Sequence, residues 1–138
     1  MLILSNIKVY ATKTLVYDDA MLFTEEERLI LEEEANNLSS EYNMDIVIVT
    51  TNDAKGKTSR QYADDFYDDV GFGQGDNYDG ILFLIDMDNR EAYISTSGLA
   101  IRYLTDLRLD NILDKVMDDG LLDGDYFSAS MAFLEAAE

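Results

Sequence analysis

Aspartate is the residue type that dominates the possible chemistry of this sequence. The chain of 138 residues has 29 acidic and 10 basic side chains, a formal net charge of -19, and neither histidine nor cysteine. Thiolate nucleophiles, Ser-His-Asp triads, disulfides and the usual zinc or iron sites are therefore excluded. Carboxylates are the ligands that hard cations prefer, so a calcium or magnesium site is the metal chemistry that remains.

The choice between the two acidic residues points in the same direction. Aspartate outnumbers glutamate 19 to 10, although an acidic coat that only solvated helices would favour glutamate, the better helix former. Aspartate in loops suits cation binding, while many of the other carboxylates are expected to be plain solvated surface. Because the charge repels phosphate backbones, nucleic acid is not an expected partner.

A loop rich in glycine and aspartate at residues 71–80 resembles two known motifs, and neither fits. The Gly-x-Gly-x-Gly spacing resembles a phosphate cradle, but such cradles follow a strand and open a helix, whereas this loop is expected to follow a helix and precede a strand. The spacing of Asn77, Asp79 and Gly80 resembles an EF-hand loop. The EF-hand interpretation fails because Gly75, at the first ligand position, has no side chain to bind an ion. In addition, the second half of the loop would be an apolar strand that cannot curl around an ion.

Asp86 and Asp88 directly follow the apolar run 81–85. This arrangement resembles the first motif of haloacid-dehalogenase phosphatases, in which Asp86 would be the phosphoryl nucleophile and Asp88 a general acid, with magnesium between them. Asn89 and Arg90 depart from that motif, and a hairpin is expected where the family needs a longer crossover. An acidic β-turn is the favoured interpretation.

Periodicity predicts the elements that must position these side chains. Helices are expected at about 24–42, 58–70, 107–119 and 125–136, and strands at about 45–51, 81–85 and 91–96. Thr24 and Glu27 form a capping box for the first helix. Strand, helix and strand in that order predict a parallel βαβ unit, and the turn at 87–90 predicts an antiparallel hairpin. The expected fold is α/β, with a small central mixed sheet and helices on both faces.

The length of the chain indicates one domain, because two halves would each bury too small a core. Residues 1–16 show no clear pattern and are interpreted as an N-terminal arm or an added segment, which leaves 17–138 as the domain. No apolar run approaches the ~20 residues of a membrane span, so direct insertion of this segment into a membrane is not expected.

The series of motifs from Val16 onward resembles the TPM domain family of thylakoid and bacterial envelope proteins, often called TPM phosphatases. No single motif is specific, but their order and spacing are. They are Val16-x-Asp18-x-Ala20, the run 45–50, the helix around 62–67, Gly71-x-Gly73, Asp79-Gly80 before the run 81–84, Asp88-x-Arg90, Ile94-Ser95-Thr96-x-Gly98 and Leu104-Thr105-Asp106.

This resemblance implies a small sheet flanked by helices, an extracytoplasmic or membrane-associated place in the cell envelope, and a partner that is an envelope protein or membrane complex. It also maps the family's acidic cluster onto Asp18, Asp79 and Asp106, as ligands of calcium or magnesium. The alternative is that Asp18 and Asp106 cap helices and Asp79 forms a turn. Asp79 and Asp106 are expected at one end of the sheet, because the antiparallel third strand returns there. Carboxylates brought together repel one another unless a cation relieves them.

Three functions stay open at this point. The resemblance favours a divalent-cation-binding interaction module of the cell envelope. The alternative is a metal-assisted acid phosphatase, which the sequence disfavours because phosphoryl transfer needs cationic groups and the arginines are scattered. A third possibility is an adaptor that binds no ion and is recognised through its shape.

Overall fold

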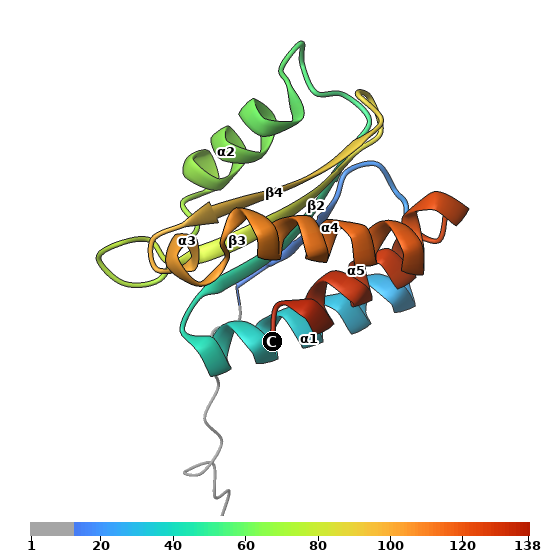
Figure 1. The fold of residues 1–138 in the computed structure, drawn as a ribbon. Helices are drawn as coiled ribbons and strands as arrows, with labels where there is room; N and C mark the ends of the chain where they lie inside the picture. The colour runs from blue at the N-terminus through green and yellow to red at the C-terminus, as the bar shows by residue number, and fades with distance from the viewer. Residues whose placement is uncertain (1–12) are drawn as a thin grey trace, which may run out of the picture.

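The computed structural model describes residues 13–138, and its centre is a four-stranded sheet with helices on both faces (Figure 1). The strands lie in the order β1-β2-β3-β4. The first three run parallel and β4 returns antiparallel to β3, which confirms the predicted fold class. Their bounds are β1 Val16–Asp18, β2 Asp45–Thr51, β3 Gly80–Asp86 and β4 Glu91–Ser97.

The helices form two unequal layers. In Figure 1, α2 covers one face of the sheet, and α1, α4 and α5 cover the other. The short α3 connects β4 to α4 at one end of the sheet. The bounds are α1 Glu25–Tyr42, α2 Ser59–Val70, α3 Ala100–Tyr103, α4 Asp106–Asp119 and α5 Tyr126–Ala136, with a 3-10 turn η1 at Leu121–Asp123.

The core forms because β2 and β3 are apolar on both faces. Every residue of these two strands is buried, as expected for strands covered by helices on both sides. On the three-helix face, the ring of Phe83 stacks on Phe133 of α5 with 4.9 Å between ring centroids. On the opposite face, Tyr62 and Tyr67 of α2 belong to the core, and α2 lies against β3 and β4.

The predicted helix starts are confirmed. The Thr24 side chain accepts from Glu27 N–H, and the Glu27 carboxylate accepts from Thr24 N–H, which completes the capping box. Thr58 caps α2 with the same reciprocal pattern through Gln61. The Thr105 hydroxyl accepts from the backbone N–H of Arg108 at the start of α4.

Two short elements differ from the sequence-based expectation. β1 and α3 span only three and four residues, too few for any periodicity to be visible. Leu15 and Val16, which the sequence places in the N-terminal arm, are buried against β2 and belong to the core. Residues 1–12 of that arm lie outside the described residues. Among residues 13–138, no helix has the length and apolar character needed to cross a membrane.

Candidate functional site

The two ends of the sheet must be distinguished before the aspartates are placed. We call the end where β2 and β3 begin the amino end, and the end where they finish the carboxyl end. Gly80 pairs with Asp45 and with Ser97 at the amino end. Asp18 pairs with Thr50 near the carboxyl end.

Asp18 is held in a structural role at the carboxyl end. Its Oδ1 accepts from the backbone N–H of Leu22 at 2.9 Å and from the Thr50 hydroxyl at 2.7 Å. Its Oδ2 accepts from Phe23 N–H at 2.9 Å. Both oxygens therefore already have donors, and they order the segment that leads into α1.

Asp79 immediately precedes β3 and lies at the amino end. Its Oδ1 accepts from the backbone N–H of Leu99 at 2.7 Å, so this carboxylate fixes the segment that leads into α3. Gly98 has a φ of 63°, in the left-handed region, and a Cβ there would collide with Asp79 Oδ1. Glycine is needed because only a residue without a side chain lets the backbone approach this carboxylate so closely.

Asp106 is the first residue of α4, which begins shortly after α3. Since α3 follows the end of β4, Asp106 comes soon after the chain has returned to the end of the sheet where Asp79 lies. Its position in the first turn is favourable for a carboxylate because the helix dipole is positive there. The sequence-based expectation that β4 returns the chain to the end where Asp79 lies is confirmed by the pairing of Gly80 with Ser97.

The register separates Asp18 from Asp79. Asp18 pairs with Thr50, and Thr50 pairs with Ile85, five residues along β3 from Gly80. Asp79 lies one residue before Gly80, so at ~3.3 Å per residue the two aspartates are about 20 Å apart along the strands. One cation therefore cannot be bound by both. Within residues 13–138, no three acidic side chains are grouped closely enough to hold a metal ion.

Asp45 holds the loop before β3 in place, a role that the sequence analysis did not predict because it treated this residue only as the start of a strand. Its side chain is almost fully buried, and it accepts from Lys13 Nζ at 2.7 Å, from Gly73 N–H at 2.7 Å and from Gln74 Nε2 at 3.2 Å. These bonds tie residues 73 and 74 to the sheet, and so position the loop that carries Asp79. A polar residue at the start of an apolar run is the signal that could have revealed this role.

Asp86 caps the β3–β4 turn. Its Oδ1 accepts from the N–H groups of Asp88 and Asn89, and its Oδ2 accepts from the Ser59 hydroxyl and the Asn89 side-chain amide. Burial raises the pKa of Asp86, but these hydrogen bonds outweigh burial and leave the pKa below its usual value. Asp88 accepts from Ala54 N–H. These contacts fit the turn interpretation, because a nucleophile needs an oxygen free to attack.

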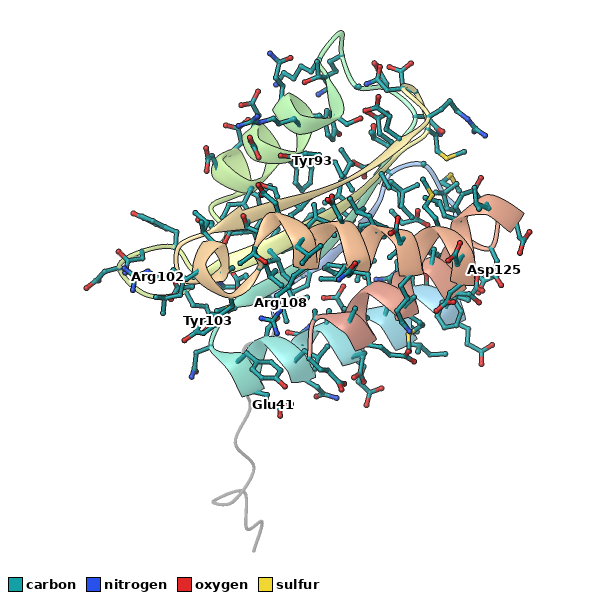
Figure 2. The ribbon with its side chains drawn as sticks, viewed as in Figure 1. Glu41, Tyr93, Arg102, Tyr103, Arg108 and Asp125 are labelled. Carbon is teal, nitrogen blue, oxygen red and sulfur yellow. The ribbon has the colours of Figure 1, made fainter. Side chains whose placement is uncertain are left out.

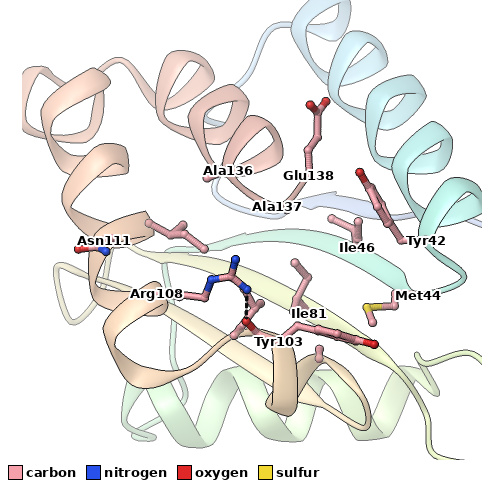
Figure 3. Close-up of a pocket in the computed structure, with 13 residues that line it drawn as sticks. Tyr42, Met44, Ile46, Ile81, Tyr103, Arg108, Asn111, Ala136, Ala137 and Glu138 are labelled. Atoms are coloured by element: carbon pink, nitrogen blue, oxygen red, sulfur yellow. Dashed lines mark hydrogen bonds between the residues drawn. The ribbon is translucent and has the colours of Figure 1, made fainter.

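A groove of about 600 Å³ lies beside α3, over the amino ends of β2 and β3 (Figure 3). Its floor is formed by Ile46 and Ile81, which pair across the two strands. Its walls come from the C-terminal ends of α1 and α5 and from α3 and α4. The lining is mainly apolar, and Arg108 and Asn111 are its polar members on α4. Sequence reasoning did not find this groove, because its lining comes from segments far apart in the chain.

This α/β architecture, with an aspartate-held α3 at the amino end of a mixed sheet, defines a class of small domains. The model of the TPM domain family matches residues 16–138. The chain therefore belongs to the TPM domain family, as the order of its motifs predicts.

One curated relative adds to this assignment. The chain is 32% identical over 120 residues to the UPF0603 protein YdjH of Bacillus subtilis strain 168. The match covers 87% of this chain and 45% of YdjH, so the chain spans less than half the length of that relative.

Solved structures share the fold. The N-terminal domain of a protein from P. gingivalis aligns with a TM-score of 0.78 and 20% identity, covering 91% of this chain and 81% of that one. The N-terminal domain of the cg2496 protein from Corynebacterium glutamicum aligns with a TM-score of 0.72 and 14% identity, covering 99% and 85%. The BA42 protein from Bizionia argentinensis gives 0.70 and 13%, covering 83% and 78%.

Proposed function

We propose that this TPM domain is a divalent-cation-binding interaction module of the cell envelope, in which the cation acts at the amino end and the partner binds at α3. The observation that carries the proposal is the hydrogen bond from Leu99 N–H to Asp79. Through it, any change in the charge or position of the Asp79 carboxylate reaches α3 directly. A cation there would alter the surface that α3 presents.

The donor chemistry fits calcium or magnesium in part. Asp79 uses Oδ1 for Leu99, and the carboxylate of Asp106 accepts no hydrogen bond from the described residues, so both can offer oxygens. Calcium takes roughly six to eight oxygen ligands, and backbone carbonyls and water can complete such a shell. Asp18 does not fit, because its two oxygens are bound at the other end of the sheet. We therefore limit the proposed site to Asp79 and Asp106.

The α3 apolar surface supports the interaction part of the proposal. We define it as Leu99, Ile101, Tyr103 and Leu107, of which Ile101, Tyr103 and Leu107 are 58%, 60% and 71% exposed. Grouped apolar side chains on a surface typically mark protein contacts. Since the chain carries a net charge of -19, the partner we propose is an envelope protein whose contact surface is apolar with a basic rim.

The phosphatase alternative is not carried further, because no feature of residues 13–138 favours it specifically. Asp86 is committed to the β3–β4 turn. Arg60 is paired with Asp64. A phosphomonoester would meet carboxylates at both ends of the sheet, and their charge opposes its approach.

Calcium is expected to stabilise the domain more than an equal ionic strength of sodium chloride. A ligand that binds only the folded state adds ~2.7 kcal/mol at 100 times its Kd, whereas screening acts alike for both salts after matching. Thermal melting of the domain in matched calcium and sodium chloride measures the difference. Equal shifts of Tm in the two salts would show that the effect is screening alone.

A further inference from the structure

The groove beside α3 combines a mainly apolar lining with one positively charged side chain, that of Arg108. Ile46, Ile81, Ala100 and Ile112 present only carbon atoms from their side chains to it. Its volume of about 600 Å³ is in the range of pockets that hold small molecules. It lies at the amino end of the sheet, in contrast to the usual ligand sites of α/β folds at the carboxyl ends of strands.

Arg108 is positioned for an anion. Its Nη1 donates to the backbone carbonyl of Tyr103 at 2.6 Å, which fixes the guanidinium at the groove, as Figure 3 shows. An arginine has five N–H donors, so most remain available. Although the chain has 29 acidic residues, no carboxylate among residues 13–138 forms a salt bridge with Arg108. A guanidinium without a carboxylate partner can bind the carboxylate of a ligand through two parallel hydrogen bonds.

Glu138 is the acidic residue of the lining, and its side chain points away from Arg108 in Figure 3. No other acidic residue of the described chain belongs to the lining, and the charge of exposed carboxylates elsewhere is screened over about 8 Å at physiological salt. Repulsion rises with the charge of the ligand, so a monoanion is favoured over a phosphate dianion. Asn111 adds one polar side chain beside Arg108 on α4.

We propose that this groove binds a small monocarboxylate amphiphile, an apolar chain or ring with one carboxylate at its end. The carboxylate pairs with Arg108, and the apolar part lies over Ile46 and Ile81. Burial of the apolar part drives binding, and the guanidinium selects the anionic end group. The groove does not include the proposed cation ligands Asp79 and Asp106, but it shares Tyr103 of α3 with the proposed partner surface.

The test compares decanoate with 1-decanol, which share an apolar chain and differ in charge. Binding is followed by calorimetry and by amide shifts of the groove residues, with a chelator present so that no divalent cation contributes. We expect Arg108→Gln to weaken decanoate binding about tenfold, which corresponds to about 1.4 kcal/mol, and to leave 1-decanol binding unchanged. Arg108→Lys keeps the charge but not the paired donors, so its affinity for decanoate is expected to lie between those of the unchanged protein and Arg108→Gln.

Arg102→Gln is the matched control, since Arg102 is an exposed arginine of α3 outside the lining (Figure 2). It is expected to bind decanoate as the unchanged protein does. Ala136→Leu narrows the groove at the end of α5 and is expected to weaken both ligands severalfold. The proposal is overturned if decanoate binds equally well to the Arg108 variants, or if its amide shifts lie outside the groove.

Discussion

Replacing Asp86 by alanine is expected to lower the free energy of unfolding by roughly 3 kcal/mol, because buried polar groups that lose a charged partner are costly. The Ser59 hydroxyl and the two donors of Asn89 would lose their acceptor, and so would the N–H of Asp88. Urea unfolding of the variant at neutral pH measures the loss. Asp68→Ala on the exposed side of α2 is the control, and a loss for Asp86 no larger than for Asp68 would contradict the account.

The pH dependence of this effect has a defined sign. The pKa of Asp86 lies below its ordinary value of 3.8 in the folded state. Its contribution is therefore complete above that ordinary value, and it is lost as the pH falls through the lower folded-state pKa. The stability difference between the unchanged protein and Asp86→Ala is expected to shrink only under strongly acidic conditions. A difference that already vanished at pH 6 would show that the carboxylate is not held as described.

Phe133→Ala is expected to lower the free energy of unfolding by about 4 kcal/mol. This value is typical of truncating a large aromatic side chain in a packed core. Phe133 is fully buried, and its ring stacks on Phe83 of the central strand, so alanine would leave a cavity between α5 and the sheet. Denaturant unfolding measures the loss. Leu122→Ala, at a leucine that is 73% exposed, serves as the control and is expected to change stability by less than ~0.5 kcal/mol.

A loss of about 1 kcal/mol or less for Phe133→Ala would contradict this packing, because it would require the site to collapse around the smaller side chain. The result also bears on the groove, since α5 supplies one wall of it through Ala136 and Ala137. A variant that loosens α5 is expected to weaken decanoate binding as well, without involving Arg108.

The sequence predicts the large elements because each has a strong local signal. The buried runs of β2 and β3 are continuous and apolar, and α1 and α2 begin with capping boxes. The parallel unit and the hairpin follow from element order. Membership in the TPM domain family rests on the order of several short motifs, and the family match covers the same stretch of the chain.

The site is less predictable because it depends on register and on contacts between distant segments. Mapping Asp18 beside Asp79 ignores their positions at opposite ends of the sheet, and only the pairing of β1 with β2 reveals this. α3 is too short for periodicity, so its exposed apolar surface is visible only in three dimensions. The groove likewise brings together Tyr42, Ile81 and Arg108, which no local pattern connects.

The proposed cation site is tested most directly by a calcium titration followed through the backbone amide resonances of the domain. We predict that saturable shifts concentrate in residues 74–79 and 98–107, and that Asp79→Asn and Asp106→Asn weaken them while Asp68→Asn does not. Asparagine keeps an oxygen that can accept from Leu99 N–H, so the first variant removes charge and preserves this contact. Shifts spread evenly over the acidic helices, or equal weakening in all three variants, would contradict a site at the amino end.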